Sequence, residues 1–316
     1  MASQPPPGLS PPDLPAAGPP PHAGPALPGR RPRGTRGWRP WTAWGALLCG
    51  FAATVVTSIV AGLIAGAAGG DLEHLPAGIE IGLTALQNVA LFTAAFLFAR
   101  ALSRPRAQDF GLRAPPNAKR AAGLLFVVWA CFLVFTVIWA TTLGLDDKSE
   151  LPERLGVDES TLNLLAVALL VTVVAPVGEE LFFRGYFFGA LRNWRGAWPA
   201  AIITGLTFGA IHLGSAPAGQ LVPLAAFGVG LSLLYHWSGS LYPSIVLHAF
   251  NNGLAFGVGE GWSPGVVLGA MAGGAIASIA VAAAIQRALG NGGGAAGEVA
   301  QTPAGVGGGA AQTTAG

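Results

Sequence analysis

The functional signal in this sequence comes from six ionisable or amide side chains inside apolar stretches, where a charge costs several kcal/mol and is usually paired or functional. These residues are Glu179, Glu180, Arg184, His212, His248 and Asn252. A glutamate in a water-poor site can act as a general base toward water, and histidines can share that proton or bind a metal. An asparagine amide can donate a hydrogen bond to an oxyanion. This inventory predicts hydrolysis of an amide bond.

Helical spacing predicts different roles for the two adjacent glutamates. Glu180 and Arg184 are four residues apart, so they share a helix face and can form an ion pair. Glu179 points about 100° away from Glu180 and has no partner on its own helix. We therefore expect Glu180 to be ionised and structural, and Glu179 to take up and release protons. His248 and Asn252, also four apart, share a face of another helix.

The positions of these residues along their apolar runs allow a single cluster. At about 1.5 Å per helical residue, Glu179 and His212 each lie about 20 Å from the cytoplasmic ends of their helices. By the same rise, His248 and Asn252 lie about 10 and 17 Å from the turn at 239–240. These depths overlap within the range that helix tilt allows. A site near the middle of a membrane is therefore geometrically possible.

Composition places these residues in a membrane protein. Only 10% of the 316 residues are charged, against roughly 25% in soluble domains. Eight apolar runs follow one another, at about 41–69, 79–101, 121–144, 162–191, 198–213, 221–237, 241–258 and 263–288. The fifth run is short for a full span. The sequence predicts an all-α bundle of about eight transmembrane helices with the lipid bilayer as its partner. The net charge of +2 indicates no nucleic-acid partner, and nothing in the sequence fixes the oligomeric state.

The distribution of basic residues predicts the orientation of the bundle. With an even number of spans, all of the 17 lysines and arginines except Lys148 and Arg154 fall on the side of both termini. Both termini are therefore expected in the cytoplasm, in a bacterial plasma (inner) membrane. Residues 1–40 form a Pro/Arg-rich tail and residues 290–316 a Gly/Ala-rich tail, both predicted to be disordered. The transmembrane bundle spans 41–289, with the catalytic helices within 160–256.

Glycines spaced four residues apart predict close helix contacts inside the bundle. They are Gly185/Gly189, Gly205/Gly209, Gly253/Gly257 and the ladder Gly261, Gly265, Gly269 and Gly273. We favour contacts within one chain over a dimer seam, because four helices share the feature.

The sequence lacks the motifs of other hydrolytic sites. It contains no Gly-x-Ser-x-Gly elbow and no His-Glu-x-x-His helix. Every aspartate falls in a tail or a loop, which removes an intramembrane aspartyl dyad.

Three motifs resemble those of a known family. They are Glu-Glu-x-x-x-Arg (179–184), Phe-x-x-x-His (208–212) and His-x-x-x-Asn (248–252), in this order on successive spans. They resemble the motifs of the CAAX prenyl protease and bacteriocin-processing family of intramembrane proteases, also called the CAAX amino-terminal protease or Abi family. The resemblance covers about residues 160–256. It implies an all-helical membrane endopeptidase that cleaves near the cytoplasmic leaflet, with the six residues above as functional positions.

Two mechanisms attach to this family, and the sequence leaves both open. In a metal-dependent mechanism, Glu179, His212 and His248 would match the His₂Glu ligand set of catalytic zinc sites. Without a cofactor, Glu179 and His212 would activate water, while His248 and Asn252 would bind the oxyanion. We favour the second mechanism, because the three ligands would come from three separate helices.

The substrate and a competing class of function also stay open. The alanine and arginine bias, with only two lysines, suggests a GC-rich bacterial genome. We therefore favour a peptide or membrane-protein substrate over a prenylated CAAX peptide. The alternative is a non-enzymatic membrane binding or scaffold protein, or a proton-coupled transporter that uses the same Glu/His cluster. The absence of an inverted repeat argues against a transporter.

Overall fold

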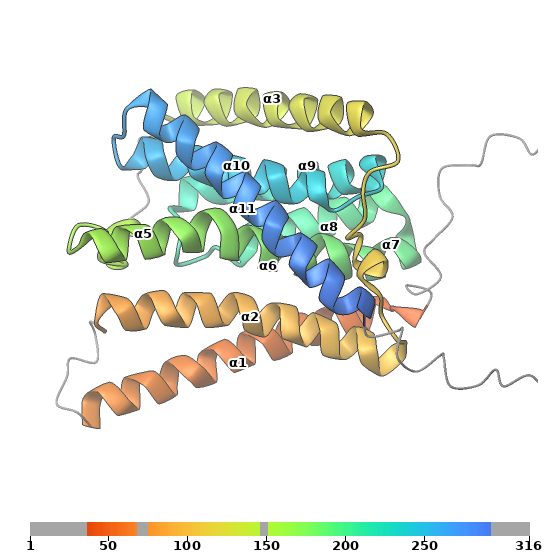
Figure 1. Cartoon of the computed structure of the whole chain (residues 1–316), viewed down its shortest axis with the longest axis horizontal. Coiled ribbons are helices and arrows are strands. Elements are labelled where there is room, and N and C mark those ends of the chain that lie inside the picture. Colours follow the sequence, from red (N-terminus) through yellow and green to blue (C-terminus); the bar gives the residue numbers. More distant parts are fainter. Residues whose placement is uncertain (1–36, 68–74, 146–150, 292–316) are drawn as a thin grey trace, which may run out of the picture. The chain divides into compact units, whose positions relative to one another are not determined.

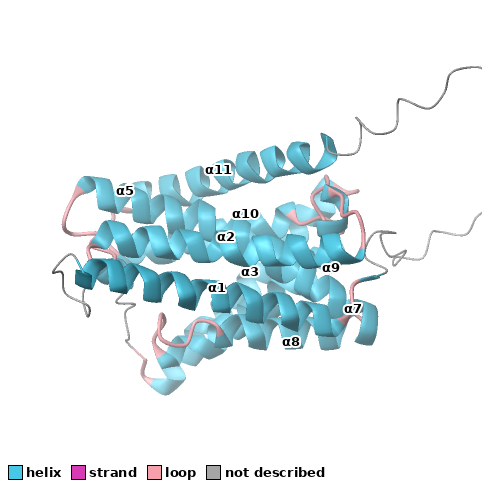
Figure 2. Ribbon diagram, turned by 90° about the horizontal axis from the view of Figure 1, so that it is seen from below, coloured by secondary structure: helices cyan, strands magenta, loops and turns pink. Residues whose placement is uncertain are grey.

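The computed structural model describes residues 37–67, 75–145 and 151–291, and the regular elements in these ranges are helices (Figure 2). The long helices are α1 (Pro40–Ala67), α2 (Ala77–Leu102), α3 (Ala118–Leu143), α9 (Leu221–Ser238), α10 (Tyr242–Gly259) and α11 (Pro264–Asn291). Four shorter helices are η2 (Ala107–Phe110), α4 (Leu151–Arg154), α8 (Ala197–Ala210) and η5 (Ala218–Gln220). The all-α prediction is confirmed. Most of both predicted tails and residues 68–74 and 146–150 lie outside the described residues.

Between α4 and α8 the chain forms a continuous helix of 35 residues, Thr161–Arg195, here called the glutamate helix. It consists of α5 (Thr161–Leu169), η3 (Leu170–Val174), α6 (Ala175–Glu180), η4 (Leu181–Phe187) and α7 (Phe188–Arg195). The segments η3 and η4 are π-helical. Glu179 and Glu180 both lie in α6, between the two π-helical segments.

Six helices of the described residues are long and apolar enough to cross a membrane. They are α1, α2, α3, the glutamate helix, the helix from Ala218 to Ser238 and the helix from Pro264 to Gly290. The helix α8 is apolar but only 14 residues long, as its sequence suggested. The helix α10 has 18 residues, and His248, Asn251 and Asn252 interrupt its apolar character. The protein is thus a multi-pass membrane protein with six candidate spans among the described residues.

Local sequence signals set the ends of several helices. The side chain of Asn117 accepts a hydrogen bond from the backbone of Arg120 at the start of α3. The side chain of Ser160 caps α5 in the same way, through the backbone of Asn163. Gly239 ends α9 with a φ of 69°, a left-handed conformation that glycine adopts without strain. This turn is short and brings α10 back beside α9.

The helices pack in pairs around the glutamate helix (Figure 1). The pairs are α1 with α2, α8 with α9 and α10 with α11. The helix α2 packs on one side of the glutamate helix, and α10 and α11 also contact it. The helix α3 packs mainly against α9. The glutamate helix therefore meets helices from both the first and the last part of the described chain.

Glycines allow two of these contacts. A Cβ atom at Gly205 of α8 would lie 2.6 Å from the backbone nitrogen of Val229 on α9. A Cβ atom at Gly253 of α10 would lie 2.9 Å from the Cα of Met271 on α11. The predicted close packing is confirmed at these positions. It is wrong for the whole predicted ladder, since a Cβ atom would meet open space at Gly261, Gly265, Gly269 and Gly273. Those glycines face away from the described bundle.

An aromatic core holds the C-terminal half of the glutamate helix. The side chains with at most 1% exposure include Phe182, Phe183, Phe187, Phe188, Phe208, Phe227, Phe110 and Trp38. The loop before α3 joins this core, because Phe110 packs against Trp38 with 5.4 Å between ring centroids. The same loop holds the α9–α10 turn, since Gly111 accepts a hydrogen bond from the backbone of Leu241.

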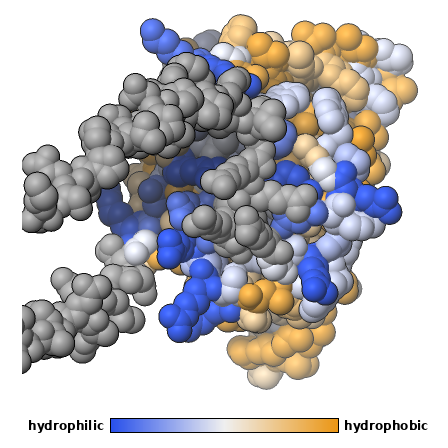
Figure 3. All heavy atoms as spheres, turned by 90° about the vertical axis from the view of Figure 1, so that its right-hand side faces the viewer, coloured by the Kyte–Doolittle hydropathy of each residue, from blue (hydrophilic) through white to orange (hydrophobic). Residues whose placement is uncertain are grey.

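Charged residues of opposite sign gather at opposite ends of the bundle. The basic residues Arg39, Arg100, Arg104, Arg106, Arg113, Lys119, Arg120, Arg192, Arg195 and Arg287 lie where α1 and α3 begin and α2, α7 and α11 end. Figure 3 looks onto this end and shows hydrophilic residues gathered there, with apolar surface on the flanks. The acidic residues Glu80, Glu153, Asp158, Glu159 and Glu260 lie near the other end. A span with this asymmetry has a preferred orientation in a membrane.

Candidate active site

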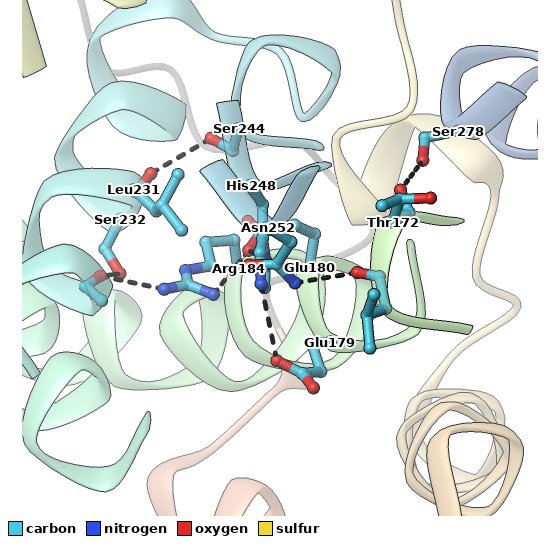
Figure 4. A network of polar contacts seen from close by, with 12 residues as sticks. Thr172, Glu179, Glu180, Arg184, Leu231, Ser232, Ser244, His248, Asn252 and Ser278 are labelled. Carbon is cyan, nitrogen blue, oxygen red and sulfur yellow. Dashed lines mark hydrogen bonds and ion pairs between the residues drawn. The ribbon is translucent and has the colours of Figure 1, made fainter. Parts of the chain in front are cut away.

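The carboxylate of Glu180 links two helices through a buried network (Figure 4). Its Oε1 atom accepts a hydrogen bond from Nη1 of Arg184 at 2.6 Å and another from Nδ1 of His248 at 2.8 Å. Glu180 and Arg184 have no exposed surface, and His248 is 3% exposed. The predicted ion pair between Glu180 and Arg184 is therefore confirmed. The contact with His248 is additional, and helical spacing could not indicate it.

The guanidinium of Arg184 is held by more than its carboxylate partner. Its Nη2 atom donates a hydrogen bond to the carbonyl oxygen of Gly228 on α9 at 3.2 Å. The guanidinium also lies over the ring of Phe208, 4.6 Å from the centroid, in a cation–π contact. A buried cation needs such contacts, because desolvation removes its favourable interaction with water. Arg184 thus ties the glutamate helix to α8 and α9.

Glu179 faces the other nitrogen of the same imidazole. Its Oε2 atom lies 3.9 Å from Nε2 of His248, and Figure 4 shows the carboxylate directed at this ring. The side chain is 14% exposed, and Oε2 is buried without a hydrogen-bond partner in the described residues. Because the carboxylate of Glu180 only accepts, Nδ1 of His248 carries the proton of that bond. In the neutral imidazole, Nε2 therefore has a lone pair that faces Glu179.

His212 lies just past the end of α8, and its imidazole ring contacts Phe208. Its Nδ1 atom donates a hydrogen bond to the carbonyl oxygen of Phe208 at 2.7 Å, which leaves Nε2 free to accept. The ring centroids of His212 and Phe208 are 4.9 Å apart. The ring of Phe208 also contacts His248, at 5.7 Å between centroids. One aromatic ring therefore touches both histidines.

Asn252 lies one turn after His248 on α10, and its amide is already oriented. The Nδ2 atom donates a hydrogen bond to the carbonyl oxygen of Val171 in η3 at 2.9 Å. A primary amide has two N–H donors, so one remains for another acceptor. The structure thus fixes Asn252 against the glutamate helix through the first π-helical segment.

The zinc ligand set considered from the sequence does not come together in this arrangement. Across residues 37–67, 75–145 and 151–291, no three histidine, cysteine, aspartate or glutamate side chains are placed to hold a metal ion. Glu179 and His248 are neighbours, whereas His212 forms its hydrogen bond with Phe208. The side chains as they stand do not fit a three-ligand catalytic zinc site.

Comparison with known families adds independent information about this segment. Residues 161–254 match the family model described as type II CAAX prenyl endopeptidase, Rce1-like. The resemblance seen in the three motifs is confirmed. The matched segment begins with α5 and ends in α10, so it contains all six predicted site residues. The match covers less than a third of the chain and supports a CAAX-type membrane peptidase in general.

A relative in Escherichia coli, an uncharacterized 24.3 kDa protein, is 29% identical over 144 residues. The aligned region covers 44% of this chain and 66% of that protein, so it spans just under two thirds of the relative. The name of that protein states no activity. No solved structure matches the chain.

Polar residues outside the matched segment also contact the glutamate helix, and the sequence reasoning missed them. Asn88 of α2 is 6% exposed and packs against Gly178. A Cβ atom added at Gly178 would lie 3.2 Å from the Cβ of Asn88. Ser278 of α11 donates a hydrogen bond to the carbonyl oxygen of Thr172 at 3.0 Å. Both are polar residues in the middle of apolar runs, which is the signal that could have singled them out.

We expect Glu180→Gln to destabilise the protein severely. A neutral amide would leave the guanidinium of Arg184 buried without a counter-charge and would remove the carboxylate partner of His248. Loss of one partner of a fully buried pair costs about 3–5 kcal/mol. Abundance in membranes and the Tm of the purified protein in detergent should both fall.

A second substitution tests the cause of that loss. Changing Arg184 to Gln as well removes the stranded cation, so the double variant should recover part of the lost Tm. Glu179→Gln serves as the matched control, because Oε2 of Glu179 has no hydrogen-bond partner in the described residues. A Glu180→Gln protein with the wild-type Tm would contradict this account of the network.

Proposed function

We propose that this protein is an intramembrane endopeptidase that hydrolyses a peptide bond of a membrane-associated or prenylated-type substrate. The observation that carries the proposal is the pair of facing atoms, Oε2 of Glu179 and Nε2 of His248, 3.9 Å apart on two helices of the matched segment. This separation exceeds a direct hydrogen bond. A water oxygen about 2.8 Å from each atom would span it.

Such a water is oriented for attack. Both facing atoms are acceptors, so the water donates one hydrogen to Glu179 and the other to His248, and its lone pairs point away. His248 thus holds the water instead of binding the oxyanion, the role favoured from the sequence, because Nε2 in this tautomer has no proton to donate. As the oxygen bonds to the carbonyl carbon of the substrate, Glu179 takes the proton. Glu179 then gives this proton to the amide nitrogen as the carbon–nitrogen bond breaks. The products are a carboxylic acid and an amine.

Asn252 and His212 complete the proposed site. The N–H of Asn252 that does not bind Val171 is available to the oxyanion of the tetrahedral intermediate. His212 keeps a free Nε2 acceptor, and we assign it as the second group that can take a proton from water. Glu180 and Arg184 hold His248 in the tautomer that this chemistry needs. Glu179 is the residue on which the reaction depends most.

The first experiment measures cleavage by the protein in proteoliposomes with an internally quenched peptide library. We expect Glu179→Gln to lower the cleavage rate by about 10²–10⁴-fold, because glutamine cannot accept a proton. Its Tm should stay near that of the wild type. Glu80→Gln, the same change on α2, is the control and should leave the rate unchanged. Proton movement across vesicles, with no cleavage by the wild type, would instead indicate a transporter.

Metal chelation tests the cofactor-free mechanism. We expect strong chelators to leave the cleavage rate within a few-fold of the control, because no metal is then needed to lower the pKa of the attacking water. The rate would be measured after dialysis against the chelator and again after addition of zinc or magnesium. Loss of activity that zinc restores and magnesium does not would reverse the preference for a metal-free site.

We further propose eight crossings in the plasma membrane with both termini in the cytoplasm. The helices α8 and α10 would add two crossings to the six candidate spans. The gathering of basic residues at one end supports this orientation. In a background without Cys49 and Cys131, an impermeant thiol reagent applied from outside should label Asp158→Cys and miss Gln108→Cys, both exposed positions. The reverse labelling pattern would invert the topology.

A further inference from the structure

The first π-helical segment of the glutamate helix is held by two other helices. In η3 the backbone bonding shifts, since Ala175 donates to the carbonyl oxygen of Leu170, five residues back. The shifted N–H of Ala175 no longer serves the carbonyl of Val171, and the regular helical donor position for the carbonyl of Thr172 is Pro176, which has no N–H. Asn252 of α10 donates to Val171 at 2.9 Å, and Ser278 of α11 donates to Thr172 at 3.0 Å. Side chains thus supply donors to two consecutive carbonyls.

The residues around the contact between Ser278 and Thr172 are buried and closely packed (Figure 4). Ser278 has no exposed surface, and Thr172 is 6% exposed. One turn before Ser278, a Cβ atom at Gly274 would lie 2.7 Å from the Cβ of Thr172, so only glycine allows this approach. The hydroxyl of Thr172 turns back to the carbonyl of Ala168 at 2.6 Å. Because Pro176 cannot donate to the carbonyl of Thr172, that carbonyl accepts from Ser278 instead.

An unpaired carbonyl in a membrane interior is costly, so this bond has a structural consequence. The segment η3 immediately precedes α6, which carries both glutamates. At its other end, α6 is held by the contacts of Glu180 with Arg184 and His248. The contacts at the two ends together determine the rotation of α6 about its axis and its position along that axis. The distance of 3.9 Å between Oε2 of Glu179 and Nε2 of His248 depends on that rotation and position.

We propose that Ser278 is a positioning residue of the active site: by holding the carbonyl of Thr172, it sets α6 so that Glu179 faces His248. Its catalytic consequence rests on the proposed function, because it concerns the placement of the proposed base. Ser278 lies on α11, beyond the matched segment 161–254. A displacement of a catalytic group by about 1 Å can cost 10²-fold in rate, so a modest release of η3 is measurable.

The experiment compares Ser278→Ala with Ser240→Ala in the full-length protein in proteoliposomes. Ser240 is the matched control, because it too has no exposed surface and donates to a distant backbone carbonyl, that of Arg113, at 2.6 Å. Two readouts are used. The first is amide hydrogen exchange across residues 170–180, measured without substrate. The second is kcat and KM for a peptide that the wild type cleaves.

We expect exchange across residues 170–180 to be about tenfold faster in Ser278→Ala, with kcat about tenfold lower and KM unchanged. Ser240→Ala should lower the Tm to a similar extent while both readouts stay at wild-type values. Ser278→Cys keeps the side-chain volume with only a weak donor, so it should show the same direction of change if the alanine variant fails to accumulate.

Three results would overturn the proposal. The first is unchanged exchange in both Ser278 variants, and the second is an equal acceleration across residues 170–180 in Ser240→Ala. The third is faster exchange with an unchanged kcat in an active protein, which would make the bond structural only. If no peptide is cleaved by the wild type, the proposed function fails, and the exchange readout still decides whether Ser278 holds η3.

Discussion

The site depends on one buried carboxylate. Glu180 has no exposed surface and accepts hydrogen bonds from both Arg184 and His248. A carboxylate and a guanidinium in this environment are stable only together, because each alone would carry an uncompensated desolvation cost. The same carboxylate fixes the tautomer of His248, so that Nε2 faces Glu179. Stability and chemistry therefore share one interaction, which is why the two adjacent glutamates differ so strongly in their surroundings.

The backbone around the glutamates follows from the membrane environment. A segment in hydrocarbon must satisfy its own hydrogen bonds, so a break in regular α-helix requires donors from elsewhere. The π-helical segment η3 receives them from Asn252 and Ser278. The π-helical segment also rotates α6 about the helix axis, relative to the direction that a regular α-helix would give. The irregular helix and the polar residues on α10 and α11 are parts of one arrangement.

The predicted site residues and some of the residues that support them lie in different parts of the chain. All six predicted site residues lie in the matched segment 161–254. The helices α2 and α11 lie outside it, yet Asn88 packs against Gly178 and Ser278 binds the carbonyl of Thr172. The proposed chemical groups therefore come from the matched segment, while part of their support comes from helices that the family model does not cover. Changes in those supporting helices can alter the site without touching a motif.

By itself, the sequence determined the all-helical membrane class and the ion pair of Glu180 with Arg184. Both follow from local rules, namely the length of apolar runs and a spacing of four residues. Only the tertiary structure decided that His248 bridges both glutamates, that His212 contacts Phe208, and that the α11 glycine ladder faces away from the described bundle. These contacts depend on the rotation of each helix about its axis and on its position along that axis relative to its neighbours. Packing against distant residues sets both quantities, so spacing along one helix carries no information about them.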